Sequence, residues 1–163
     1  MALSSLFRER VLTREVWLPR PRAEVFPFFA DAANLNDITP PWLGFRILTP
    51  LPMEMRTGAL IDYRIRLRGV PIRWRTEISC WEPPVRFVDE QIRGPYRLWR
   101  HEHTFHAENG GTRVEDRVEY QVSLGDWLPG RVAHRLWIRP ELDRIFEYRR
   151  QRMATRFGTS KHE

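Results

Sequence analysis

The stretch LIDYRIRLRGVPIRWRTEISC, residues 60–80, alternates apolar and charged side chains on either side of a turn at Gly69. In its first half the apolar side chains take the odd positions, Ile61, Tyr63, Ile65 and Leu67. In its second half the inward side chains take the even positions, Ile72, Trp74, Thr76, Ile78 and Cys80. A side-chain period of two is that of a β-strand, so residues 60–80 predict an antiparallel hairpin with one buried and one solvated face.

The same alternation continues outward over residues 45–123, and turn signals divide it at hairpin spacing. The turns fall at residues 57–58, 69–71, 82–84, 94–95 and 109–111. They predict a meander of about six antiparallel strands. The last of these strands directs alternate residues inward, namely Thr112, Val114, Asp116, Val118, Tyr120 and Val122.

The N-terminal flank predicts a further strand and two short helical segments. Residues 11–18 have strand composition, and Pro19 ends the run. Pro21 suits the first turn of a helix with an apolar face over residues 25–29, in which Pro27 predicts a kink or a late start. Residues 34–42 predict a second short helix or turn, interrupted by two prolines.

The C-terminal flank predicts a loop over residues 124–137 and then one long helix. An apolar stripe at helical spacing defines that helix: Leu142, Ile145, Phe146, Arg149, Met153 and Phe157. The class is therefore α+β. A curved antiparallel sheet with one wet face must cover its other face, and the terminal helix is the natural cover.

Length and composition favour a single domain, residues 1–163, in a reducing cytoplasm. The single cysteine, Cys80, allows no intramolecular disulfide. No run approaches the roughly 18 uncharged apolar residues of a membrane helix. The short apolar patch at residues 2–7 precedes its charges, the reverse of a secretory signal, so we expect a soluble protein that is not exported.

The net charge of +6 raises the question of nucleic acid. All but one of the 27 basic residues are arginines, the exception being Lys161, and acidic residues are interleaved with them. Mixed signs along strands are typical of a solvated sheet face rather than of a phosphate-binding stripe. We therefore expect no nucleic-acid partner.

Two histidines are the strongest chemical feature of the sequence. Trp99, His101, His103 and Phe105 share one face of a predicted strand, and the apolar pair indicates that this face points inward. Imidazole can hydrogen-bond a ligand or transfer protons near neutral pH. The alternative is a pair of core histidines whose hydrogen bonds are satisfied by Asp116, Asp89 or Tyr120.

A metal site lacks a convincing third ligand on sequence grounds. His106 lies on the opposite face of the predicted strand from His101 and His103. Only a bulge or a distant carboxylate could therefore supply the third ligand. No phosphate-binding glycine loop, nucleophile elbow or paired-cysteine zinc motif is present. We expect no metal and no cofactor.

Other candidates come from the neighbouring strand and the last helix. Asp89 and Gln91 lie on the same face of the predicted strand as Phe87, which makes them candidates for inward polar groups. The alternative is that residues 88, 90 and 92 form the inward face. Arg149 could pair with a ligand carboxylate or an inward aspartate, or extend to solvent along its apolar stem. The aromatic residues would be ordinary core in most folds and the wall of a cavity in a cavity fold. The candidate ligand-binding set is Tyr63, Trp74, Phe87, Asp89, Gln91, Trp99, His101, His103, Phe105, Asp116, Tyr120, Phe146 and Arg149.

The order of elements resembles the helix-grip fold of START-like lipid-transfer domains and of the polyketide cyclase/dehydrase superfamily. The most specific pieces are NLNDITPP at 34–41, RFVDEQ at 86–91, GPY at 94–96 and WRHEHTF at 99–105, together with residues 111–112 and 118–120. They look like a branch of small bacterial proteins. The resemblance implies a curved antiparallel sheet of about seven strands wrapped around a long C-terminal helix, two short helices after the first strand, and a cavity between sheet and helix.

The resemblance implies two functions, because members include passive carriers of sterols, quinones or lipids and enzymes that cyclise or dehydrate polyketides. We expect a carrier of a hydrophobic or amphipathic small molecule. The alternative is a cyclase or dehydratase in which His101 or His103 acts as general acid or base, oriented by Asp116 or Asp89. In a third possibility, tryptophans fill the cavity and the exposed face binds a partner.

Overall fold

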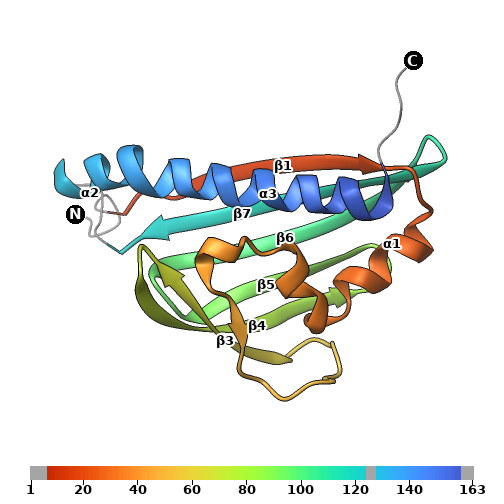
Figure 1. The fold of residues 1–163 in the computed structure, drawn as a ribbon, viewed down its shortest axis with the longest axis horizontal. Coiled ribbons are helices and arrows are strands. Elements are labelled where there is room, and N and C mark those ends of the chain that lie inside the picture. Colours follow the sequence, from red (N-terminus) through yellow and green to blue (C-terminus); the bar gives the residue numbers. More distant parts are fainter. Residues whose placement is uncertain (1–6, 124–127, 159–163) are drawn as a thin grey trace, which may run out of the picture.

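The computed structural model describes residues 7–123 and 128–158, and it contains one sheet and a set of helices on a single face of it (Figure 1). The elements in chain order are β1 (Arg10–Leu18), α1 (Arg22–Phe29), the 3₁₀ helices η2 (Ala32–Ile38) and η3 (Pro41–Leu43), β2 (Arg46–Ile47), β3 (Leu60–Leu67), β4 (Val70–Glu82), β5 (Arg86–Arg93), β6 (Tyr96–Glu108), β7 (Gly111–Val122), α2 (Leu128–Ala133), the π-helical turn η4 (His134–Ile138) and α3 (Arg139–Phe157).

The seven strands form one antiparallel sheet in the order β1-β7-β6-β5-β4-β3-β2. Helix α3 runs along the β1 and β7 side of the sheet, while α1 and the 3₁₀ helices lie farther across it (Figure 1). This arrangement confirms the predicted helix-grip fold, with six strands between residues 45 and 123 and short helices after the first strand.

Strand register confirms which face of the 60–80 hairpin is buried. Ile61 pairs with Thr76, Tyr63 with Trp74, and Ile65 with Ile72. Directly paired residues in an antiparallel ladder point to the same side, so the alternate side chains of both strands gather on the concave face.

Cys80 does not continue this inward row, contrary to the prediction. A register shift lies between Ile78 and Cys80, so that Cys80 pairs with Val88 and Trp81 pairs with the inward Phe87. A bulge adds one residue and reverses the faces beyond it. Trp81 therefore packs in the core, and the Cys80 thiol lies against Glu82 on the outer side.

The predicted loop over residues 124–137 is wrong from Leu128 onward, where α2, η4 and α3 follow one another without a break. Residues 124–127 lie outside the described residues. The missing N–H of Pro140 would interrupt a continuous α-helix. The wider turn of η4, in which the Arg139 N–H donates to the His134 carbonyl, precedes it and lets the chain continue.

The N-terminal segment builds an aromatic core beside the sheet. Helix α1 begins at Arg22, directly after Pro21, and includes Pro27, so of the two alternatives expected for Pro27, a kink or a late start, the late start does not occur. The Phe26 ring lies 5.1 Å from that of Phe105. The predicted segment over residues 34–42 is present as η2 and η3.

Within the described ranges, no helix has the length and apolarity needed to cross a membrane. The apolar patch at residues 2–7 falls outside these ranges except for its last residue.

Gly111, the first residue of β7, is required by a close backbone approach. A Cβ there would lie 2.3 Å from the Leu18 carbonyl oxygen and 2.6 Å from the ring of Trp17. We expect Gly111→Ala to lower the free energy of unfolding by about 1–3 kcal/mol, because β1 and β7 must separate locally to admit the methyl group. Urea unfolding followed by circular dichroism measures this; an unchanged midpoint would contradict the packing described.

Candidate functional site

A cavity of about 190 Å³ lies between the concave face of the sheet, α3 and the η2–η3 segment. One water needs roughly 10–15 Å³ by this measure, so the space exceeds that of a few trapped waters. Aromatic and aliphatic side chains supply most of the wall, among them Tyr63, Trp74 and Trp99 from the sheet and Phe146 from α3. Trp74 and Trp99 border the space and do not fill it.

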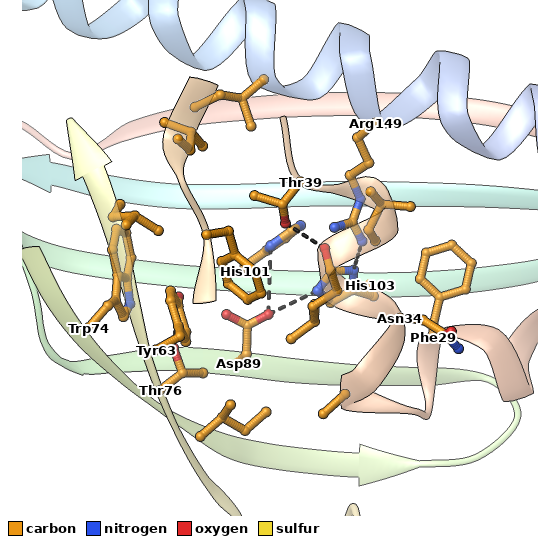
Figure 2. Close-up of a pocket in the computed structure, with 18 of the residues that line it drawn as sticks. Phe29, Asn34, Thr39, Tyr63, Trp74, Thr76, Asp89, His101, His103 and Arg149 are labelled. Atoms are coloured by element: carbon orange, nitrogen blue, oxygen red, sulfur yellow. Dashed lines mark hydrogen bonds and ion pairs between the residues drawn. The ribbon is translucent and has the colours of Figure 1, made fainter. Parts of the chain in front are cut away.

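Nine of the thirteen candidate residues line this cavity: Tyr63, Trp74, Phe87, Asp89, Trp99, His101, His103, Phe146 and Arg149. Figure 2 shows Asp89, His101, His103 and Arg149 converging at one place in the pocket, with Tyr63, Thr76 and Trp74 beside them. The cavity therefore has an apolar body and a polar cluster.

Gln91 and Phe105 are placed elsewhere than predicted. The Gln91 amide donates to the Tyr96 carbonyl and accepts from the Tyr96 N–H, at 2.7 and 3.2 Å, so it holds the β5–β6 turn. Phe105 is fully buried and packs on Phe26 and Phe29 in the core under α1. Alternation along the strand identifies the inward face but not the cavity wall, because the inward face extends beyond the cavity at both ends of the hairpin.

Tyr120 and Asp116 also lie outside the cavity wall. The hydroxyl of Tyr120 is 2.9 Å from Nε2 of His134, a partner supplied by η4, so Tyr120 does not satisfy either cavity histidine. Asp116 is 4% exposed and lies behind the two histidines, where it contacts them rather than the cavity.

Three central strands bring the polar cluster together. On β5 and β6, Asp89 is paired with His101, and on β6 and β7, His103 is paired with Asp116. Nε2 of His101 lies 3.0 Å from Oδ1 of Asp116, and Nε2 of His103 lies 2.9 Å from Oδ2 of Asp89. Both histidines are thus satisfied by carboxylates, as the alternative interpretation predicted, and both also face the cavity.

Arg149 completes the cluster from the helix side. Its Nε lies 3.3 Å from Oδ2 of Asp116, and its Nη2 lies 3.3 Å from Nδ1 of His103. The residue is 9% exposed, so it does not extend to solvent. Of the predicted alternatives, the structure supports pairing with an inward aspartate.

Charge within the cluster follows from these contacts. Burial opposes ionisation of Asp116, but the Arg149 guanidinium and the two imidazoles outweigh it and hold the pKa of Asp116 well below its usual value. Burial likewise opposes ionisation of Asp89, but its hydrogen bond with His103 and the nearby positive charges outweigh burial and lower its pKa. The pKa of His103 is raised, because its two carboxylate partners outweigh burial.

His101 differs from its neighbour, because burial together with the nearby His103 lowers its pKa. The two rings lie 3.8 Å apart between centroids, a distance at which two positive charges would repel strongly. The contacts thus favour the charged form of both carboxylates and of His103, and the neutral form of His101.

Trp74 carries an unused donor. Its indole Nε1 is buried and has no hydrogen-bond partner among the described residues, while the ring lines the cavity. Beside it, the hydroxyls of Tyr63 and Thr76 are 3.3 Å apart. A buried donor without a partner costs about 1–3 kcal/mol, so an acceptor atom bound there would be favoured.

Several wall residues were not singled out from the sequence. Residues 28–55 contribute Asn34, Leu35, Ile38, Thr39, Leu43, Phe45 and Met55. Short 3₁₀ helices and connecting loops have no periodicity that separates a cavity face from a core face. The only available signal was the NLNDITPP stretch, which carried the family resemblance without indicating which side chains point inward.

The pairing of Arg149 with Asp116 predicts a large stability effect. Arg149→Met removes the guanidinium and leaves a buried carboxylate, so we expect a loss of about 3–5 kcal/mol in the free energy of unfolding. The double variant Arg149→Met/Asp116→Asn should regain part of it. Arg150→Met, the control on the exposed side of α3, should cost less than about 1 kcal/mol. Denaturant titration tests this, and equal losses at positions 149 and 150 would contradict it.

Comparisons with known proteins agree with this architecture. The family model described as polyketide cyclase/dehydrase and lipid transport matches residues 18–139. No curated protein sequence matches the chain. Among solved structures, Mll3558 from Rhizobium loti has a TM-score of 0.65 at 15% identity, over 90% of this chain and 98% of that one.

Two further structures extend the likeness across distant organisms. Ms6760 from Mycobacterium smegmatis has a TM-score of 0.63 at 16% identity, over 94% of this chain and 92% of that one. Ginseng major latex-like protein 151 from Panax ginseng has a TM-score of 0.61 at 9% identity, over 91% and 97%. At these identities the structures show the fold alone. The match over residues 18–139 shows more: the chain belongs to the polyketide cyclase/dehydrase and lipid transport family.

Proposed function

We propose that this protein binds and carries an amphipathic small molecule, such as a lipid, a quinone or a polyketide-like compound, in the cavity between the sheet and α3. The observation that carries this proposal is an unfilled space whose wall is mostly aromatic and aliphatic, with one cluster of charged groups. Ligand sites commonly combine an apolar wall with a few placed polar groups.

The polar groups suggest how such a molecule would lie. Its apolar body would pack against Tyr63, Trp99 and Phe146. An oxygen acceptor, a carbonyl or a hydroxyl, would take the free donor of Trp74. A second polar group would meet the histidine, aspartate and arginine cluster, so the favoured ligand carries oxygen at two separated positions.

Two remaining expectations bear on this proposal. A core filled by tryptophans, which the partner-binding alternative requires, receives no support from a cavity of about 190 Å³. A cytoplasmic setting fits the single cysteine, which is free.

An enzyme of cyclase or dehydratase type is the second candidate function. Its supporting observation is that His101 and His103 line the cavity while carboxylates hold both rings in place. A carrier needs only shape and orienting hydrogen bonds, whereas a dehydratase removes water from its ligand. Native mass spectrometry of freshly purified protein separates the two: a carrier keeps an added ligand unchanged, and a dehydratase returns it with the mass of one water lost.

The Trp99 side chain provides a direct test of ligand binding. We expect Trp99→Ala to weaken binding of anilinonaphthalene sulfonate about tenfold, or ~1.4 kcal/mol, because one wall of the cavity is lost. Trp17 is also half-buried, but it lies outside the cavity and donates to the Glu108 carbonyl, so Trp17→Ala is the matched control and should leave the affinity unchanged. Fluorescence titration measures both, beside urea unfolding of each variant.

The competing outcome for Trp99 is a structural one. Truncating an aromatic side chain in a filled core costs about 3–5 kcal/mol. If Trp99→Ala loses that much stability and the parent protein binds no probe, the cavity is not a ligand site.

A further inference from the structure

We propose that Asp89, His101 and His103 form a binding site for a divalent transition-metal ion at the polar end of the cavity. One carboxylate oxygen and one ring nitrogen from each histidine all lie within 4.8 Å of one another. Figure 2 shows the three side chains turned toward a common point. This inference goes beyond the proposed function and does not depend on it.

The separations of the donor atoms suit one ion. Oδ2 of Asp89 lies 2.9 Å from Nε2 of His103 and 3.6 Å from Nδ1 of His101. Nitrogen and carboxylate oxygen bind zinc at about 2.0–2.2 Å, so two ligands at 90–110° around one ion are separated by roughly 3.0–3.5 Å. The two separations that involve Asp89, 2.9 and 3.6 Å, lie at the two edges of that range.

Asp116 holds the opposite edges of both rings. Its Oδ1 lies 3.0 Å from Nε2 of His101 and 2.8 Å from Nδ1 of His103. A carboxylate only accepts, so in the metal-bound state each of those nitrogens would carry an N–H and the other nitrogen of each ring would ligate. For His103 this requires Nη2 of Arg149, itself a donor 3.3 Å from Nδ1, to turn away. Metal-binding histidines almost always donate their remaining N–H to a carboxylate, a carbonyl or water, and here Asp116 is a carboxylate within reach of both rings.

The contact between His103 and Asp89 occupies the place of the ion in the described network. His103 bonds Asp89 through Nε2, and its Nδ1 also lies 3.3 Å from Nη2 of Arg149. A metal bound at Nε2 would displace this contact, and the N–H of the ring would then be on Nδ1, toward Asp116. The rival interpretation is that this hydrogen-bond network is complete in itself and binds no ion.

The net charge of the cluster and its position on the cavity wall favour an ion with open coordination positions. Asp89 and Asp116 contribute two negative charges, and Arg149 contributes one positive charge through its contact with Asp116. A divalent ion would leave the cluster with one net positive charge, which an anionic oxygen of a bound molecule would balance. Three protein ligands leave further coordination positions open, and Asp89 and both histidines line the cavity.

The donor set identifies the class of ion. Two imidazoles and one carboxylate bind Zn²⁺ in hydrolytic sites and Fe²⁺ in oxygen-dependent sites. Calcium and magnesium prefer sets of oxygen ligands and are disfavoured by the two nitrogens. The shared chemistry is that of a borderline first-row divalent ion, and separate titrations distinguish the two.

The test uses full-length, tag-free protein stripped of metal with a chelator. Titration calorimetry with Zn²⁺, and with Fe²⁺ under anaerobic conditions, should give one equivalent per chain for the preferred ion. Co²⁺ should give visible absorption bands of a low-symmetry nitrogen–oxygen site. We expect Asp89→Asn and His103→Gln each to weaken binding at least 100-fold, and Asp116→Asn to weaken it about 10–100-fold through the histidines it orients.

His106→Gln is the matched control, because His106 lies on the same strand with the opposite parity and should leave metal affinity unchanged. Circular dichroism and probe binding by each variant show that the fold and cavity persist. Absence of one-equivalent binding in the parent protein, or equal affinity in Asp89→Asn, His103→Gln and the parent, would overturn the metal site. Retained probe binding in that case would leave the ligand-binding proposal standing.

Discussion

The ion pair between Asp116 and Arg149 joins an inner strand of the sheet, β7, to the helix that covers it. Asp116 is on β7, Arg149 is on α3, and the two are nearly excluded from solvent. A buried carboxylate is costly unless it is paired and hydrogen-bonded, so α3 must dock with Arg149 above β7. This requirement sets the position of α3 along the sheet more sharply than its apolar residues do, because apolar contacts tolerate sliding.

The remaining polar groups follow from that docking. With Asp116 held by Arg149, the two histidines of β6 can each contact a carboxylate, and the register of β5, β6 and β7 brings Asp89 to the opposite side of the rings. The cluster is therefore connected through three neighbouring strands inside the sheet. Charged groups placed on such strands, rather than on loops, are held in fixed geometry, which both ligand recognition and metal binding need.

The cavity exists because the covering elements are unequal. Helix α3 packs over β1 and β7 through Leu142 and Phe146, and α1 fills the other end with phenylalanines. Between them the sheet is covered by two short 3₁₀ helices, whose side chains reach the wall without filling the space. Close packing at both ends and a thin cover in the middle give a stable fold with an unfilled interior.

The sequence by itself determined the order of the strands, the long terminal helix and the inward faces of β3, β6 and β7, because the periods of strand and helix depend on local geometry alone. It left open whether Arg149 pairs with an inward aspartate or extends to solvent. It could not locate the bulge beside Cys80, since a single extra residue leaves the alternation intact on both sides. Nor could it separate cavity from core: Phe105 and Trp99 share one face of β6, yet one lies under α1 and the other beside the open space. Tertiary structure decided that difference, and it also brought Asp89 and Asp116 to the two histidines, because contacts between strands depend on register and on what covers them.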